Sequence, residues 1–343
     1  PSADANVFLK YEPLDSKESK NGVSDVLSSP KHWSDLRLST KINRIFGRIL
    51  DFNLYQLIKN IPLIVIMYTI KQPKKIIFGK NSCVDYIFPE NSLVITSNGS
   101  MKRGWIEYLG IKNYHIFDKV EPNPSINTVE KIIDEFQNID FSYVIGLGGG
   151  SSLDVAKFVS QKLHKKKIMI PTTFGSGSEV TRISVLKVDG KKKSFHDDNL
   201  FADISITDSF FIYDSPIEII KNSAIDALAQ CSEGFDSKNG NYFTKFLCNY
   251  AFELLEEGVM NMDQEKIVKG SLTSGLGFGN CSTTLGHALS YVFSNEGYSH
   301  GHTLSHTTLL AHEFNKSKYY ERFKKIVEKL GFSKIQLKQN YDE

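Results

Sequence analysis

The chain has 343 residues, of which 41% are hydrophobic and 23% are charged, a balance typical of a globular protein with a sizeable core. The formal net charge of +2 excludes the strongly basic field of a nucleic-acid-binding domain. The four cysteines show no CxxC spacing, which favours a reduced, cytoplasmic protein over a disulfide scaffold.

The most apolar stretch, Ile61 to Ile70, contains a proline and is too short to span a bilayer, so we expect no membrane partner. No secretory signal peptide is predicted. Residues 1–45 are polar and weakly periodic, and the chain begins with Pro1 instead of methionine. We therefore expect residues 1–70 to be an extension or linker, with the remnant of a fused domain as an alternative.

Short apolar runs alternate with helical periodicity between residues 71 and 212. The predicted strands are 74–80, 92–97, 113–117, 141–147 and 166–171. The predicted helices are 100–110, 125–139 and 151–163. This alternation indicates βαβ units, and hence a parallel sheet covered by helices on both faces.

Strand signals stop after about residue 212, and helical spacing continues to the end of the chain. The predicted helices are 225–235, 242–259, 264–280 and 321–331. The predicted fold class is therefore α/β plus all-α, divided into residues 71–212 and 213–343.

The segment "VIGLGGGSSLDVAKF", residues 144–158, places Gly148, Gly149, Gly150 and Ser151 between a strand and a helix. Glycine permits positive φ, Ser151 or Ser152 can cap the helix, and the amides of the first helical turn attract anions. Taken alone, the turn is compatible with a phosphate cradle and with an ordinary tight turn.

The loop "IPTTFGSGSEVT", residues 170–181, carries several hydroxyl groups, among them those of Thr172, Thr173 and Ser178. These groups suit phosphate, ribose or carboxamide, although the segment could also be an ordinary hydrophilic loop. Because this loop and the glycine turn follow strands of one parallel sheet, we expect both at the edge where such sheets bind ligands.

A carboxylate and several imidazoles of the second half could hold a divalent metal. Asp226 and Gln230 are four residues apart on a predicted helix, and a loop is expected to join His287 and His300. Two alternatives stay open. These residues could belong to an ordinary helix face and core, or His302 and His306, also four apart, could form a rival metal pair.

The segments "GGGSSLDVAK", "IPTTFGSGSE", "IDALAQCSEGF" and "GHALSYVFSNEGYSHGH" occur in this order. The combination resembles the iron-containing (type III) alcohol dehydrogenases, over about residues 74–315. The resemblance implies a dinucleotide-binding domain at 71–212 and a helical metal-binding domain at 213–343. Relatives continue for several more helices, so the second domain is expected to be truncated.

The resemblance also implies roles for single residues. The pyrophosphate would lie on Gly148, Gly149, Gly150 and Ser151, with Asp154 and Lys157 bracing the helix, and Thr172, Thr173 and Ser178 would line the nicotinamide side. The implied metal ligands are Asp226, Gln230, His287 and His300. Commoner members have histidine in place of Gln230, so the implied Fe²⁺ has Zn²⁺ as an alternative.

Nucleotide preference is read from residues 94–104, where NAD-preferring relatives carry an acid at the position of Ser97. The absence of a carboxylate removes repulsion toward a 2′-phosphate, and Lys102 could pair with that phosphate. NADPH is therefore preferred over NADH, although an ordinary polar loop is the simpler interpretation.

Gln230, "HALSY" with "HGH", and a "KKKS" segment at 191–194 resemble the phosphonoacetaldehyde reductase branch of the family. The implied reaction is reduction of phosphonoacetaldehyde to 2-hydroxyethylphosphonate, with Arg182 and Lys193 as anion-binding candidates. One alternative is a general short-chain alcohol or polyol dehydrogenase. Another is a nucleotide-binding homologue without catalysis.

The proton of this reaction would come from water, from the cofactor ribose or from a histidine, for which His302 is the candidate. Commoner relatives have a second histidine where this chain has Tyr291. The remaining expectations are a small aldehyde or alcohol as ligand, no nucleic acid, a homodimer and a cytoplasmic location.

Overall fold

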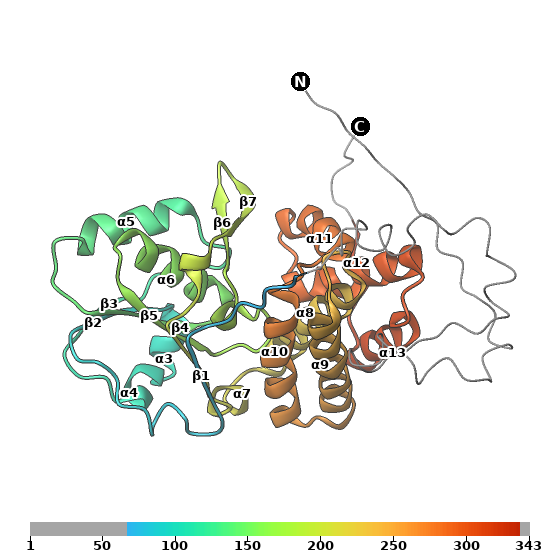
Figure 1. The fold of residues 1–343 in the computed structure, drawn as a ribbon, viewed down its shortest axis with the longest axis horizontal. Coiled ribbons are helices and arrows are strands. Elements are labelled where there is room, and N and C mark those ends of the chain that lie inside the picture. The colour runs from blue at the N-terminus through green and yellow to red at the C-terminus, as the bar shows by residue number, and fades with distance from the viewer. Residues whose placement is uncertain (1–66, 337–343) are drawn as a thin grey trace, which may run out of the picture. The chain divides into compact units, whose positions relative to one another are not determined.

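The structure is a computed structural model, in which residues 67–336 are described (Figure 1). Nearly all of the predicted extension, residues 1–70, lies outside these residues. The division predicted at residue 212 falls inside a short helix, α7 (Phe210–Tyr213).

A parallel sheet of six strands forms the first half of the described chain, in the order β1-β8-β5-β4-β2-β3. The strands are β1 (Lys75–Phe78), β2 (Ser92–Ile95), β3 (Tyr114–Phe117), β4 (Tyr143–Gly148), β5 (Lys166–Pro171) and β8 (Ile204–Thr207). The first five confirm the predicted strands. The sequence analysis missed β8, a run of only four residues that lies between β1 and β5.

Helices cover both faces of this sheet, and its residues alternate between two hydrophobic clusters. Leu93 and Val144 belong to the cluster formed with α5 (Ile126–Phe136) and α6 (Gly150–Lys162). Val94 and Ile145 belong to the other cluster, which extends into the helical part. A sheet buried on both faces is typical of an α/β protein, and the predicted fold class is confirmed.

The helix predicted at 100–110 is wrong, because this segment forms two short helices, α3 (Asn98–Lys102) and α4 (Trp105–Leu109). Gly104 lies between them with a φ of 68°, a left-handed conformation that interrupts an α-helix. The chain thereby changes direction just after the carboxyl end of β2.

An antiparallel hairpin that the sequence analysis missed follows the hydroxyl-rich loop. Its strands are β6 (Ile183–Val188) and β7 (Lys191–His196), joined by Asp189 and Gly190 with φ values of 51° and 75°. Positive φ at both central positions is required by a type I′ turn, for which Asp-Gly is a strong sequence signal. Lys187 and Lys192 lie directly opposite each other in this hairpin.

Helices make up the rest of the described chain, and no strand follows β8 up to residue 336. They are α8 (Ile217–Asp236), α9 (Tyr242–Asn261), α10 (Gln264–Phe278), α11 (Leu285–Asn295), α12 (His300–Asn315) and α13 (Tyr320–Leu330). Helix α8 is extensively buried, and its neighbours α9, α10 and α12 pack against it (Figure 1). Within residues 67–336, every helix is too short or too polar to cross a bilayer.

The loop after β5 approaches the backbone of α8 closely. A Cβ atom built on Gly175 would lie 2.5 Å from the carbonyl oxygen of Ser223, and one on Gly177 would lie 2.7 Å from the Cα atom of Gly275 in α10. Only glycine allows such contacts between backbones. They connect the sheet to the helical part beside the carboxyl end of β5.

Gly175→Ala tests this contact, because the added methyl group must displace the backbone of Ser223. We expect the free energy of unfolding to fall by about 1–3 kcal/mol in chemical denaturation. Gly99→Ala is the control, since a Cβ atom there has its nearest neighbour at 3.6 Å and alanine favours α3. Equal stability of the two variants would contradict the close approach.

Candidate metal and nucleotide site

A cavity of about 490 Å³ opens between the carboxyl edge of the sheet and the helical part. The sheet side contributes the glycine turn, the hydroxyl-rich loop and the β6–β7 hairpin. The helical side contributes α8, α11 and the start of α12. The predicted site residues in the lining are Gly150, Ser151, Asp154, Thr173, Ser178, Asp226, Gln230, His287 and His300.

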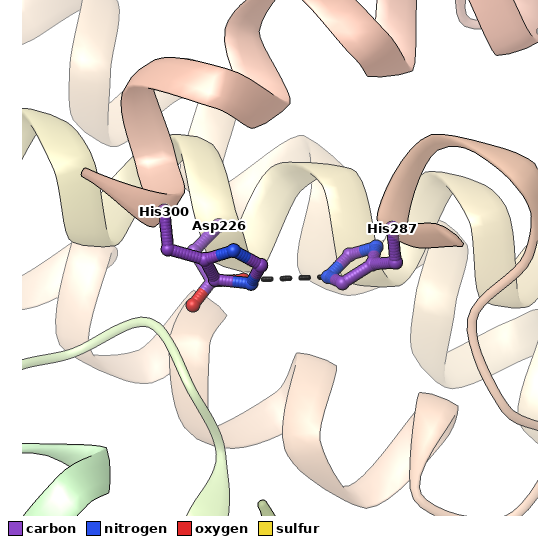
Figure 2. A group of neighbouring side chains, drawn as sticks. All are labelled: Asp226, His287 and His300. Carbon is purple, nitrogen blue, oxygen red and sulfur yellow. Dashed lines mark ion pairs between the residues drawn. The ribbon is translucent and has the colours of Figure 1, made fainter. Parts of the chain in front are cut away.

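Asp226, His287 and His300 converge at this cavity (Figure 2). The Nε2 atom of His287 lies 3.5 Å from Oδ1 of Asp226, and Nε2 of His300 lies 3.7 Å from the same oxygen. One candidate ligand atom from each residue falls within 4.8 Å of the others. The three side chains come from three different helices, α8, α11 and α12, so tertiary packing creates the cluster.

The predicted loop between His287 and His300 is largely helical. His287 lies in the first turn of α11, and His300 is the first residue of α12. The two rings meet edge to face, with centroids 5.5 Å apart. The short connection between the helices therefore brings both imidazoles to one side of α8.

Gln230 lies one turn after Asp226 on α8, and its Nε2 donates a hydrogen bond of 2.9 Å to Oδ1 of Asp226. The oxygen of the same amide, Oε1, takes no part in this bond. This Oε1 is buried and has no hydrogen-bond partner among the described residues.

The charged groups of the cluster shift the pKa values of one another. Burial alone lowers the pKa of His287, but the carboxylates of Glu233 and Asp226 outweigh it and raise the pKa to about 9. Burial, together with the neighbouring His287, lowers the pKa of His300 to about 4, against the opposing effect of Asp226. Burial raises the pKa of Asp226, yet the two imidazoles bring it below its usual value. Asp226 is thus an ionised carboxylate.

The residues present fit a divalent cation. The atoms His287 Nε2, His300 Nδ1 and Gln230 Oε1 are buried without a hydrogen-bond partner in the described structure, and buried polar atoms are normally satisfied. A carboxylate, an amide oxygen and imidazole nitrogens are ligands for iron(II) and zinc. Within residues 67–336, no second cluster has three such ligand groups, so His302 and His306 lack a third partner.

The glycine turn ends β4 and begins α6. Gly148 has a φ of 147°, and Gly149 is the N-cap residue. No side chain caps α6, so the predicted capping by Ser151 or Ser152 is wrong. The Oγ atom of Ser151 instead accepts a hydrogen bond of 3.3 Å from the amide of Asn123. An uncapped helix start directed at a cavity is suited to bind an anion.

The hydroxyl-rich loop lies directly against this turn. A Cβ atom on Gly149 would lie 3.1 Å from Oγ1 of Thr173, and one on Gly150 would lie 2.9 Å from the side chain of Ser176. A larger residue at either glycine would displace the neighbouring side chain of the loop. The turn and the loop therefore form one continuous wall.

Asp154 and Lys157 brace the loop from inside the protein. The carboxylate of Asp154 accepts hydrogen bonds from Oγ of Ser178 at 2.6 Å and from the amide of Val185 at 2.9 Å. The fully buried ammonium group of Lys157 donates to the carbonyl of Ser178 at 2.9 Å. Because both Asp154 oxygens already accept hydrogen bonds, this residue positions the loop more readily than it binds a ligand directly.

Five predicted cofactor residues are not part of the cavity lining. Gly148 and Gly149 form the turn behind Gly150, and the amide of Thr172 donates to the carbonyl of Gly148 at 2.9 Å. Ser97 is the N-cap residue of α3 at the carboxyl end of β2. Lys102, which is exposed, ends the same helix and is likewise absent from the lining.

The structure does not bring His302, Arg182 and Lys193 to the cavity. The Nε2 atom of His302 lies 2.7 Å from the carbonyl oxygen of Ser333, because His302 is two residues, or about 200°, further round α12 than His300. Arg182 pairs with the exposed Asp198 at 3.0 Å.

Lys193 points away because side chains alternate along β7, and its ammonium group lies over the ring of Phe195. The neighbouring Lys192 lines the cavity instead, together with Lys187 on β6. The Asp189-Gly190 turn sets the register of the hairpin and pairs Lys187 with Lys192, so the sequence contained the signal that these two side chains share a face. Burial lowers the pKa of Lys192, and the nearby Lys187 acts in the same direction.

Tyr291 is a further lining residue, one turn after His287 on α11. Burial raises the pKa of its hydroxyl, and the carboxylates of Asp226 and Asp154 add to this effect. Its hydroxyl is therefore protonated at neutral pH. The spacing of four from His287 was the sequence signal for its place in the cavity.

Two family models match the chain. Residues 73–209 match iron-containing alcohol dehydrogenase, and residues 220–343 match the C-terminal part of the Fe-containing alcohol dehydrogenase family. The chain is 33% identical to the 4-hydroxybutyrate dehydrogenase of Clostridium kluyveri over 52% of this chain and 56% of that protein. The matches to this and another curated relative thus span about half of the relatives' length.

Solved structures show the same fold. The iron-containing alcohol dehydrogenase of Thermotoga maritima superposes with a TM-score of 0.68 and 26% identity, over 78% of this chain and 84% of that chain. A sulfoacetaldehyde reductase of Bifidobacterium kashiwanohense, solved in complex with NAD⁺, has a TM-score of 0.70 at 23% identity, over 78% of this chain and 87% of that one. The two family models, which together match most of the chain, show that it belongs to the iron-containing alcohol dehydrogenase family.

Proposed function

We propose that the protein reduces a small aldehyde to a primary alcohol with a divalent metal and NAD(P)H. The observation that carries this proposal is that one cavity is lined both by the Asp226–His287–His300 cluster and by the uncapped start of α6. A ligand cluster for a Lewis acid and an anion-binding turn are the two parts that such a reaction requires.

Asp226, Gln230, His287 and His300 would hold Fe²⁺, with Zn²⁺ as the alternative. The turn at Gly148 to Ser151 would hold the pyrophosphate of the nucleotide, and Thr173 and Ser178 would line its nicotinamide side. When bound, the metal supplies Lewis acidity toward a carbonyl oxygen, and the reduced nicotinamide supplies the hydride. The residues of the chain supply position, charge and a proton.

We infer that Oη of Tyr291 donates the proton to the product oxygen, in place of the predicted His302. Tyr291 lines the cavity and keeps its proton at neutral pH, whereas His302 lies outside the lining. A general acid must lie within hydrogen-bond reach of the atom it protonates. Its place in the cavity lining therefore supports Tyr291 as the proton donor.

For the substrate we propose phosphonoacetaldehyde, which would give 2-hydroxyethylphosphonate. Lys192 and Lys187 put positive charge into the cavity lining, as an anionic aldehyde requires. One relative is named for 4-hydroxybutyrate, which is also an anion. The same lysines could instead contact the phosphates of the nucleotide, so a neutral short-chain alcohol or a polyol is the competing substrate.

The substrate is tested by NADPH oxidation with the iron-loaded protein under exclusion of air. We expect kcat/KM for phosphonoacetaldehyde to exceed that for acetaldehyde by about tenfold or more, because an ionic contact adds binding energy. Chelator-treated protein is the control and should be inactive. Equal or better turnover of acetaldehyde would support the proposed aldehyde reductase activity and contradict phosphonoacetaldehyde as its substrate.

A nucleotide-binding homologue without catalysis is the remaining alternative. It would bind NADPH, measured by quenching of protein fluorescence or by calorimetry, and turn over neither aldehyde. Binding measured beside turnover therefore separates this alternative from a protein that does not bind nucleotide.

The proton donor is tested by Tyr291→Phe, which removes one hydroxyl and leaves the ring. We expect kcat to fall by about 100-fold with the metal content unchanged, as for loss of a general acid. His302→Gln is the matched control, and it should retain kcat within about threefold, since His302 is outside the cavity lining. A large loss of kcat in His302→Gln alone would identify His302, and not Tyr291, as the proton donor.

Nucleotide preference is tested by Ser97→Asp, which places a carboxylate at the carboxyl end of β2. We expect the ratio of kcat/KM for NADPH to that for NADH to fall by about tenfold or more, because the carboxylate repels a 2′-phosphate. Ser142→Asp is the control, since Ser142 precedes β4 at the opposite edge of the sheet. An unchanged ratio in Ser97→Asp would show that the nucleotide ribose does not lie beside Ser97.

A further inference from the structure

Glu233 is a buried carboxylate near the candidate metal centre, for which the sequence analysis gave no role. It lies seven residues after Asp226 on α8, on the helix stripe that also carries Gln230. The residue is only 1% exposed. Burial of a charged group at this level requires compensating hydrogen bonds.

These hydrogen bonds all come from the N-terminal end of α11. One oxygen of Glu233, Oε2, lies 2.5 Å from Nδ1 of His287 and accepts a bond of 3.2 Å from the amide of Thr284. The other oxygen accepts from the amide of Gly286. A carboxylate oxygen can only accept, so Nδ1 of His287 must carry the hydrogen.

The chain also makes space for this contact. A Cβ atom on Gly286 would lie 2.6 Å from Oε1 of Glu233, so a larger residue would push the carboxylate away. Helix α11 has no side-chain cap of its own at Thr284. Glu233, from a different helix, accepts the hydrogen bonds that a cap would accept.

We propose that Glu233 is a positioning residue that binds Nδ1–H of His287 and thereby fixes the ring with Nε2 directed toward Asp226. This inference rests on the metal centre proposed above. The tautomer of an imidazole is set by the partner of its other nitrogen, and Nε2 of His287 has no hydrogen-bond partner in the described structure. Glu233 thus selects the nitrogen that is available to the metal.

Two substitutions test the proposal by metal binding, without relying on catalysis. Glu233→Gln keeps the size and one acceptor oxygen but removes the charge, and Glu233→Ala removes the contact. We expect the dissociation constant for Zn²⁺, measured by competition with a chelator, to rise by about 10- to 100-fold, as is typical for the loss of such a partner. The visible spectrum of bound Co²⁺ should change as well, since it reports ligand geometry.

Asp208→Asn is the matched control for general damage from removing a buried carboxylate. Asp208 is fully buried and accepts hydrogen bonds from the amides of Asn81, Cys83 and Phe210, and none of its hydrogen-bond partners within residues 67–336 is a histidine. This variant should lower the melting temperature and leave the Zn²⁺ dissociation constant and the Co²⁺ spectrum unchanged.

Three results would decide against the proposal, and they are distinguishable. Zn²⁺ affinity within threefold of wild type in both folded Glu233 variants would overturn the positioning role while the metal centre stands. Equal loss of affinity in Asp208→Asn would attribute the effect to general destabilisation. Failure of the wild-type protein to bind Zn²⁺ or Co²⁺ would reject the metal centre itself, and the role of Glu233 with it.

Discussion

The close backbone approach between the loop after β5 and α8 is the constraint on which the rest of the site depends. Gly175 and Gly177 have no side chain, so the loop can lie against Ser223 and Gly275. The same loop continues into Ser178 and the hairpin. Asp154 and Lys157, both on α6, form hydrogen bonds with Ser178. The backbone contact therefore aligns the sheet edge with the helices that carry the candidate ligands.

Helix α8 then organises the helical side of the cavity with one stripe of polar residues. Asp226, Gln230 and Glu233 point from one buried face, although most residues around them on this helix are apolar. Buried carboxylates require partners, and the partners of Asp226 and Glu233 come from α11 and α12. The packing of α8 against α11 and α12 therefore determines how the candidate ligands are arranged.

Much of this arrangement was predictable from sequence, since five strands and the α/β-then-α order follow from periodicity and turn signals. The failures have local causes. Strand β8 has only four residues, too few for a period to be recognised, and Gly104 divides a segment whose apolar spacing suggested one helix. His302 and Lys193 lie outside the cavity lining because helix α12 and strand β7 direct their side chains away from it, a direction that residue type alone does not give.

The β6–β7 hairpin forms a two-stranded sheet of its own, separate from the six-stranded sheet, and forms a β-bridge to the rest of the chain only at Lys187, opposite Ser125, among the described residues. Its inward positions, Lys187 and Lys192, therefore contribute to the cavity without contributing to the sheet ladder. Exchange of these two side chains would change the charge of the cavity without changing the strand pairing of the six-stranded sheet. This hairpin is accordingly a segment in which the charge lining the cavity can change independently of the sheet that carries the glycine turn.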